Sequence, residues 1–495
     1  MGELRGWVVY GAEPGLAPGP VEVADEGDLR PEIADLGRLA RRGMRAVVRS
    51  ARAEDRPRLS RMLLEHLGTG AGAFDVVEET WRPYDHVNVQ AGIDAWLADP
   101  ARSHDLVGVV TQHGQPVALA ELLSQEGPAD HFGPRPGNAA RVNVASGPDG
   151  QVRACIRCGL YLVTEGEART AVLLRAPTPE FGHGELSVQV VSTDEGRAAR
   201  AAAEIRAAAL ENNVFRGQVL SFGQEVFGHG QTLLQFHRRP SMDADQLILA
   251  PETLAEIHRQ VVGVARHKAR LLGAGQHLKR GLLLYGPPGT GKTHTVRYLT
   301  SRLVDTTVLQ LTGNALHLIA EACSIARTLQ PAMLVIEDVD LIAEDRGMHP
   351  GQHPLLFQLL NEMDGLAEDA DVVFVLTTNR ADLLEPALAA RPGRVDQAVA
   401  LELPGPDARR RLFDLYRGGL AVDTSRMDDV IARTDGVTAS FLKELLRRAA
   451  LLAATRESDA DGELHVSADD LATALDELLD TRNAMTRTLL GSAPA

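Results

Sequence analysis

Short, continuous apolar runs recur in the second half of the chain and alternate with stretches of helical pattern. The runs are Gly281–Tyr285, Thr307–Leu311, Met333–Ile336 and Val372–Leu376. Strands that are apolar throughout are typical of a parallel sheet covered on both faces, and the helical stretches between them supply that cover. The pattern therefore predicts an α/β domain with a parallel sheet over residues 247–403.

The chain becomes helical again after Pro404. Ser467 and Asp470 have the spacing of a capping box, which predicts the start of a last helix over Ala468–Leu479. We expect a small helical domain over 404–485, followed by a tail, 486–495.

The first half of the chain has a different pattern. Residues 1–30 are rich in Gly, Pro and acidic residues, and we expect them to be loose. A helical pattern follows, and then short β-like runs with turn clusters between them: Leu106–Val110, Arg141–Ala145, Gly159–Thr164, Thr170–Leu174 and Glu185–Ser192. An Ala-rich helical segment, Glu195–Asn212, leads to one more strand, Gly217–Phe222. This order predicts an α+β amino-terminal domain over 31–240, with a linker at His237–Gln246.

Composition narrows the class of protein. Of the 495 residues, 44% are hydrophobic and 24% are charged, as in soluble globular proteins. The net charge of −16 and an aromatic content of 4% disfavour whole-chain binding to nucleic acid or anionic membrane. The start of the chain lacks a signal-peptide pattern, and no apolar run approaches the roughly 18 to 20 residues of a membrane helix. We expect a soluble, cytoplasmic protein.

The clearest chemical motif is Gly286–Thr293, GPPGTGKT, placed between an apolar run and a helical pattern. It fits the P-loop pattern, in which glycines let the backbone N–H groups curl around phosphates. Lys292 is one of only four lysines in the chain, and its ammonium is expected at the β- and γ-phosphates. The hydroxyl of Thr293 is expected to bind Mg²⁺.

From about Ala250 to Leu479 the chain resembles an AAA-type ATPase module. Besides the P-loop, four segments match that family in order and spacing: PAMLVIEDVD (331–340) for the Walker B strand, LLNEMDG (359–365) for the helix after it, TTNR (377–380) for sensor 1, and PALAARPGRVD (386–396) for the arginine-finger segment. The module resembles the ATPase cores of membrane AAA proteases and valosin-containing protein.

The resemblance implies a site for ATP and Mg²⁺ and a role for each matching residue. Asn379 orients the attacking water, while Arg391 and Arg394 contact the γ-phosphate of a neighbouring subunit. The implied nucleotide-binding residues are Gly286, Pro287, Pro288, Gly289, Thr290, Gly291, Lys292, Thr293, His294, Gly436 and Ala439. Because arginine fingers act in trans, the resemblance also implies a ring of identical subunits, usually a hexamer and occasionally a heptamer.

The acidic pair departs from the family pattern. Most AAA modules end the Walker B strand with Asp then Glu, whereas this chain has Glu337 then Asp338. Successive residues of a strand point to opposite sides, so we expect Glu337 on the Mg²⁺ side and Asp338 at the attacking water. The same reversal occurs in AAA proteins resembling the mitochondrial Rieske-protein translocase. We expect slow but real hydrolysis.

The stretch Thr312–Arg327 corresponds to the pore loop of threading AAA unfoldases but contains no aromatic residue. We therefore expect rigid-body motion of amino-terminal domains rather than hand-over-hand threading, although Gly347–His353 could line the pore instead.

Other patterns carry less information. Six arginines spaced like one helix face, Arg38 to Arg56, fit a solvated face better than a surface for phosphate or anionic lipid. Cys155 and Cys158 form an isolated C-x-x-C, and no H-E-x-x-H zinc-protease motif occurs.

Three functions remain compatible with the sequence. We favour an ATP-hydrolysing ring that remodels a protein or complex, with the amino-terminal domain selecting an unknown protein partner. The alternatives are a nucleotide-gated switch or scaffold with little turnover, and a nucleic-acid-acting ATPase using the Arg38–Arg56 stripe.

Overall fold

The computed structural model describes residues 59–68, 74–111, 117–124, 133–177, 185–224, 232–340, 354–382, 395–456 and 464–480. The chain divides into two units, Met1–Pro57 and Arg58–Ala495, and the described residues all belong to the second. The expected loose segment, the Arg38–Arg56 stripe, the 347–353 loop and the tail 486–495 lie outside the described residues.

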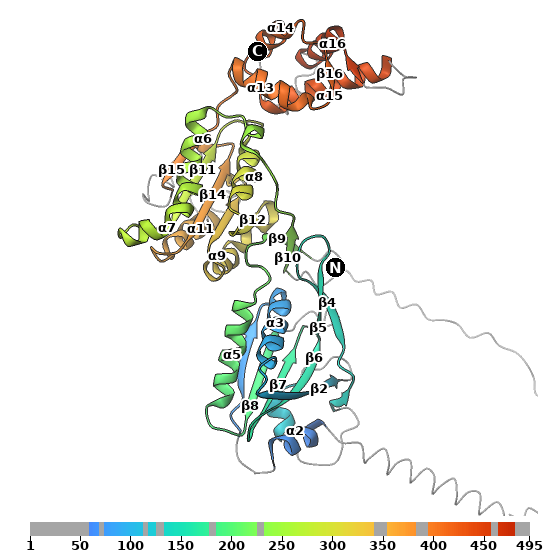
Figure 1. Cartoon of the computed structure of the whole chain (residues 1–495), viewed down its shortest axis with the longest axis vertical. Helices are drawn as coiled ribbons and strands as arrows, with labels where there is room; N and C mark the ends of the chain where they lie inside the picture. Colours follow the sequence, from blue (N-terminus) through green and yellow to red (C-terminus); the bar gives the residue numbers. More distant parts are fainter. Residues whose placement is uncertain are drawn as a thin grey trace, which may run out of the picture. The chain divides into compact units, whose positions relative to one another are not determined.

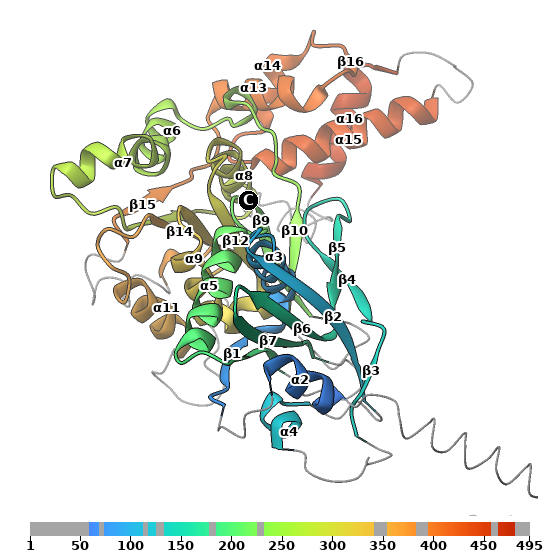
Figure 2. The same cartoon turned by 60° about the horizontal axis from the view of Figure 1, so that its bottom comes forward.

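An antiparallel sheet of six strands forms the centre of the amino-terminal part (Figure 2). Its order is β1-β8-β7-β6-β2-β3, with β1 (Val77–Trp81), β2 (Arg102–Val110), β3 (Arg135–Gly137), β6 (Cys158–Glu165), β7 (Ala168–Arg175) and β8 (Leu186–Ser192). The β-like runs expected from the sequence in β2, β6, β7 and β8 are confirmed as strands.

Helices cover both faces of this sheet, because successive side chains of a strand point to opposite sides. On one face Val172 and Leu174 of β7 pack with α3 (His86–Leu97) and α5 (Arg197–Glu211). On the other, Ala171 and Leu173 pack with α2 (Leu59–Leu67) and α4 (Leu119–Ser124). The α+β class expected for this part is therefore confirmed.

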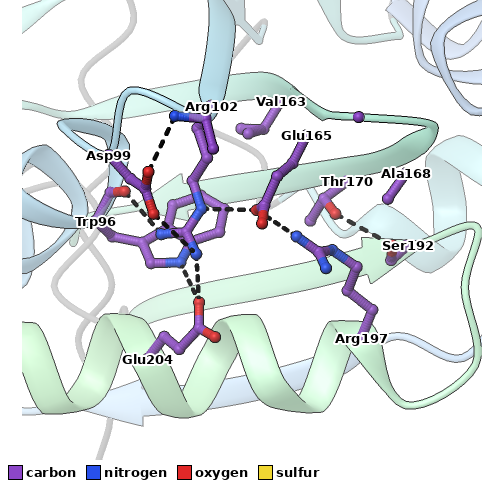
Figure 3. A network of polar contacts seen from close by, with 12 residues as sticks. Trp96, Asp99, Arg102, Val163, Glu165, Ala168, Thr170, Ser192, Arg197 and Glu204 are labelled. Carbon is purple, nitrogen blue, oxygen red and sulfur yellow. Dashed lines mark hydrogen bonds and ion pairs between the residues drawn. The ribbon is translucent and has the colours of Figure 1, made fainter.

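A polar network fastens α5 to the sheet where β2 begins and β6 ends (Figure 3). Arg102 donates from Nε to Glu165 and from a terminal nitrogen to Glu204, both at 2.8 Å. Glu165 also accepts from Arg197, and the indole N–H of Trp96 donates to Glu204 at 2.8 Å. The guanidinium of Arg102 lies 4.5 Å from the Trp96 ring centre, a cation–π distance. One nearly buried arginine thus ties α3, α5 and β6 together.

The second sheet has seven strands in the order β10-β9-β12-β13-β14-β11-β15. They are β9 (Val219–Gln224), β10 (Thr232–His237), β11 (Arg280–Tyr285), β12 (Thr307–Leu311), β13 (Ala332–Ile336), β14 (Val372–Thr378) and β15 (Gln397–Ala400). Neighbouring strands are parallel except for the β9–β10 pair. The four apolar runs of the sequence are β11 to β14, which confirms the predicted parallel sheet.

Helices cover both faces of this sheet too (Figure 1). Leu282, Leu284 and Val373 pack on the side of α6 (Pro251–His258) and α8 (Lys292–Arg302). Leu283 and Phe374 pack on the opposite side with α9 (Ile319–Thr328) and α11 (Pro354–Asp364). A short π-helical stretch, η5 (Arg259–Gly263), joins α6 to α7 (Val264–Gly273).

The division between the two sheets differs from the sequence-based boundary at residue 240. β9 and β10 lie inside the range 31–240, yet β9 pairs in parallel with β12 through Val219↔Val308, Leu220↔Leu309 and Ser221↔Gln310. Sheet membership therefore places β9 and β10 with the α/β part. The apolar content of these strands suits either sheet, and only long-range pairing selects one of them.

The last described part is helical, as expected. It contains α13 (Pro406–Arg417), α14 (Met427–Arg433), α15 (Ala439–Arg456) and α16 (Ala468–Leu479), together with the short pair β16 (Ala421–Val422) and β17 (His465–Val466). The expected capping box is present: Ser467 N donates to Asp470 Oδ2 at 2.9 Å, and Asp470 N donates to Ser467 Oγ at 3.1 Å. In the part of the chain described here, we find no helix with the length and apolarity needed to cross a membrane.

Arg239 joins the β9–β10 strands to the segment that follows α8. Its half-buried guanidinium donates to four backbone carbonyls: Thr300 at 2.7 Å, Leu303 at 2.9 Å, Gly217 at 2.9 Å and Thr306 at 2.7 Å. Burial lowers the pKa of Arg239. The neighbouring Arg238 instead pairs with Asp149 at the surface, where its side chain is 78% exposed.

We expect Arg239→Ala to lower the free energy of unfolding by about 2 kcal/mol, because carbonyls shielded from water lose their donor. Arg238→Ala is the matched control and should leave the unfolding midpoint unchanged, since its ion pair is exposed. Urea unfolding of the full chain, followed by circular dichroism, measures both. Equal losses from the two variants would contradict the role given to Arg239.

Candidate nucleotide site

The loop between β11 and α8 depends on glycine at two close approaches. Gly286 has φ +151°, and a Cβ there would lie 2.3 Å from the carbonyl oxygen of Leu401. Gly289 has φ +80°, and a Cβ there would lie 2.9 Å from the hydroxyls of Thr438 and Ser440. A side chain at either position would clash and would disfavour the backbone conformation. The glycines thus let the loop curl between the end of β15 and the lid, as we call the helical part that follows Pro404.

Lys292 begins α8 and turns back into this loop. Its Nζ donates to the carbonyls of Gly286 at 2.7 Å and Pro287 at 2.9 Å, and the residue is 8% exposed. Burial lowers the pKa of Lys292, while Asp338 and Asp340 act in the opposite direction. The ammonium is held where the loop and the helix N-terminus meet, a position suited to an anion.

The next two residues, Thr293 and His294, stand in the first turn of α8, and each keeps a substantial part of its surface exposed. Partial burial of the His294 ring, and secondly the charges of Arg297 and Lys443, lower the pKa of His294. The neutral imidazole is favoured there.

Glu337 directly follows β13 and continues its backbone ladder, with N donating to Leu311 O at 3.1 Å. Burial, and secondly the charge of Asp338, raise the pKa of Glu337, whereas a side-chain hydrogen bond with Thr293 lowers it. The contact places the Glu337 carboxylate beside the hydroxyl that the sequence assigned to Mg²⁺. Both are oxygen ligands of the kind that Mg²⁺ prefers.

Asp338 does not continue the strand, which corrects the geometric reason given for its role. β13 ends at Ile336, and Asp338 has φ +53°, in the left-handed region. Its N–H donates to Thr377 Oγ1 at 3.1 Å, and its carboxylate accepts from Asn379 Nδ2 at 3.2 Å. The two acidic residues still have different partners, but a backbone turn rather than strand alternation separates them.

Asp340 is a site residue that the sequence analysis did not select. It is 8% exposed, and its carboxylate accepts from Thr378 Oγ1 at 2.8 Å and from Asn379 N at 3.2 Å. It therefore holds the turn that carries Asn379. The sequence does contain a signal for Asp340, which is the third acidic residue of EDVD. From the sequence alone, however, such a residue cannot be distinguished from a solvent-exposed aspartate.

A cavity of about 640 Å³ adjoins the loop on the lid side. Thr290 and Ala439 line it together with the segments 248–251 and 398–405. Ala439 thus lines the same cavity as Thr290 of the P-loop. Gly436 is not among the lining residues, and its φ of +71° marks a turn before α15.

Some sequence-based candidates remain outside this geometry. Arg391 and Arg394 lie outside the described residues. Cys155 and Cys158 are unbridged, and burial raises the pKa of each thiol to about 11. Within the described ranges, no three His, Cys, Asp or Glu side chains are grouped so that they could hold a metal ion.

Comparisons with known proteins agree with the fold and the loop. Residues 282–403 match the family model described as ATPase family associated with various cellular activities (AAA). Similar curated proteins include the ATP-dependent zinc metalloprotease FtsH 2 of Sphaerobacter thermophilus, 34% identical over 48% of this chain and 38% of that protein. The 26S protease regulatory subunit 6A of Caenorhabditis elegans is 29% identical over 46% of this chain and 55% of that protein.

A third relative, the proteasome-activating nucleotidase of Methanothermobacter thermautotrophicus, is 30% identical over 50% of this chain and 62% of that protein. Each match therefore spans less than two thirds of the relative. The family match covers β11 to β15, the strands that bear the loop and the acidic residues. Residues 282–403 of this chain therefore form a module of the AAA family.

Proposed function

We propose that the chain binds Mg-ATP and hydrolyses it as a subunit of an AAA ring that remodels or moves a protein or complex. The observation that carries this proposal is the meeting of Lys292, Thr293, Glu337, Asp338 and Asn379 at the ends of neighbouring strands. Asn379 bonds Asp338, Thr293 bonds Glu337, and Asp338 acts electrostatically on Lys292. One cation, one hydroxyl, two carboxylates and one amide are the groups that phosphoryl transfer to water needs.

Each group has a role that fits its contacts. Lys292 leaves the loop carbonyls to neutralise the β- and γ-phosphates. Thr293 and Glu337 would supply oxygen ligands to Mg²⁺, and the bound cation would partly neutralise the negative charge of the phosphates. Asp338 accepts a proton from the attacking water while Asn379 orients it, and Asp340 holds the Asn379 turn.

The site is completed by a neighbour in this proposal. Arg391 and Arg394 reach the γ-phosphate of the next subunit, which requires a head-to-tail ring, with six copies as the expected number. The names of two relatives, a protease regulatory subunit and a proteasome-activating nucleotidase, refer to action on protein-degrading partners. We extend this only to the class of substrate, a protein selected by the amino-terminal part.

The mode of action is inferred from the lack of an aromatic side chain in 312–327 that could hold a threaded polypeptide. A short 3-10 helix, η6 (Gly313–Leu318), leads directly into α9, and no aromatic residue occurs in 312–327. The sheet that carries the nucleotide site includes β9, which follows α5 of the amino-terminal part in the chain, so the connection from α5 to β9 supplies another way to transmit movement. We therefore propose rigid-body displacement in place of threading.

A nucleotide-gated switch is the second candidate. Asp338 has a shorter side chain than the glutamate usual at this position, and Asn379 already occupies one of its oxygens. A displacement of about 1 Å can cost on the order of 100-fold in rate. An assembled ring that binds Mg-ATP but hydrolyses none would replace the remodelling function with this one.

Lys292→Ala should abolish ATP binding without unfolding the chain, because the ammonium faces the phosphates whereas the glycines set the loop. Isothermal titration calorimetry measures the affinity. Lys268→Ala, which removes a half-exposed ammonium near Asp371, is the matched control and should bind ATP normally. Unchanged affinity in Lys292→Ala would refute the assignment.

Asp338→Asn should bind Mg-ATP with near-normal affinity and reduce kcat by about 100-fold or more, since asparagine cannot accept the proton. Asparagine tolerates the left-handed conformation found here, so the backbone turn should persist. Glu337→Gln should chiefly weaken the dependence on Mg²⁺. Phosphate release against Mg²⁺ concentration tests both variants. Normal turnover in Asp338→Asn, with Glu337→Gln inactive yet tightly binding, would reverse the two roles.

Arg391→Ala and Arg394→Ala subunits should bind ATP but hydrolyse it about 1000-fold more slowly, as expected when an arginine finger is lost. Mixing either variant with Lys292→Ala should restore part of the activity, because an intact site then forms at some subunit boundaries. Intact mixed rings without any restored phosphate release would exclude a shared site.

A further inference from the structure

Two strands outside the nucleotide site each keep one edge without a partner in the described part of the chain. β4 (Arg141–Ala145) pairs only with β5 (Val152–Ile156) in a separate two-stranded sheet. β10 is the outermost strand of the seven-stranded sheet and pairs only with β9. Such edges present backbone N–H and C=O groups that can pair with another extended chain.

Both edges line the same cavity, which has a volume of about 650 Å³. Val142–Ala145 of β4 and Leu234–His237 of β10 contribute four consecutive residues each. A strand that turned only one face to a cavity would contribute every second residue, because its side chains alternate. Consecutive lining residues therefore indicate that the cavity runs along the edge of each strand.

The cavity also has an apolar wall. Tyr84, Phe215 and Phe236 line it, with ring centres 6.4 Å apart for Tyr84 and Phe215 and 5.7 Å apart for Phe215 and Phe236. Val142 and Val144 pack against the same cluster and are only half-buried. Apolar side chains of an occupant would gain free energy by covering this wall.

Charge adds a second requirement for the occupant. Arg157 lines the cavity, is half-buried, and has no ion-pair or hydrogen-bond partner for its guanidinium among the described residues. The lining contains one carboxylate, Asp149, and that group is already paired with Arg238. The His86 Nε2–H is used by the carbonyl of Ile156 at 2.8 Å. In a chain of net charge −16, this local excess of positive charge favours a carboxylate.

We propose that the cavity between β4 and β10 binds an extended polypeptide segment that carries alternating apolar side chains and a carboxylate. The segment adds as a strand, its backbone pairing with both edges, its apolar side chains on the aromatic wall and its carboxylate at Arg157. This proposal rests on the proposed remodelling function and specifies the chemistry of its protein partner. Its binding energy does not involve ATP, so the two proposals fail independently.

The sheet connects the bound segment to the nucleotide site. β10 pairs with β9, β9 pairs with β12, and Leu311 at the end of β12 accepts from the backbone N–H of Glu337. A strand added to β10 would therefore extend the sheet whose other strands carry the acidic residues.

The probe is a fluorescein-labelled peptide of about eight residues, a common strand length, with alternating Val and Thr and one central Glu. Fluorescence anisotropy with the full chain, without nucleotide, measures its affinity. A second peptide has the same side chains but N-methyl groups on alternate residues, which block backbone donors on one edge. We expect it to bind about tenfold more weakly or worse, since several backbone hydrogen bonds are lost.

The charge requirement is tested by changing both partners. Arg157→Gln, or Gln in place of the peptide Glu, should each weaken binding about tenfold, and the two changes together should cost little more than one. Arg153→Gln is the matched control: Arg153 lies on β5, which Arg157 directly follows, pairs with Asp94 and does not line the cavity. It should leave the affinity unchanged.

Hydrogen exchange identifies where the peptide lies. Bound peptide should slow amide exchange in 142–145 and 234–237 together. Three results would each overturn the proposal: no binding to a folded chain, equal affinity for the N-methylated peptide, or binding without slower exchange on both strands. Concentration-dependent protection in the absence of peptide would also overturn it, since it would assign these edges to a second copy of the chain.

Discussion

Burial of β11, β13 and β14 on both faces is the constraint on which the nucleotide site depends. Alternate residues of these strands enter two separate apolar clusters, one against α6 and α8 and the other against α9 and α11. Each fully buried large side chain contributes about 1.5–3 kcal/mol, so the strands are held firmly in register. Polar groups are excluded from the strand interiors, and the functional ones follow where the strands end: Gly286 after β11, Glu337 after β13 and Asn379 after β14.

The site then concentrates charge in a partly buried place. Lys292 lies among carbonyls and acidic side chains, and burial acts against its charge as it acts against that of Glu337. Asp338 adds a left-handed backbone conformation that a non-glycine residue adopts at some cost. These are features of a site shaped for a ligand that supplies compensating charge, and phosphates with a divalent cation would do so.

The β9–β12 pairing determines which strands would move together when the amino-terminal part is displaced. A displacement that left the ATPase sheet intact would carry β9 and β10 with the sheet. The pivot would then lie between the end of α5 at Glu211 and the start of β9 at Val219. Movement there would change the hydrogen bonds from Val214 N to Asn88 at 2.9 Å and from Arg216 to Gln330 O at 3.2 Å. It would also change the packing of Phe215 against Tyr84 and Phe236.

Local patterns were sufficient for much of this protein. The loop GPPGTGKT, the buried strands, the helical end and the Ser467 capping box depend on residues close together in the chain, and each could be read from spacing alone.

Other features arise from pairings between distant residues. Asp340 becomes a support for Asn379 only when β13 and β14 lie side by side, and Asp338 leaves the strand geometry because of its contacts with Thr377 and Asn379. The place of β9 and β10, and the cavity that joins β10 to β4, likewise depend on which strands meet. Strand pairing is a long-range choice that apolar alternation does not encode, and for that reason folding, not local sequence, settled these features.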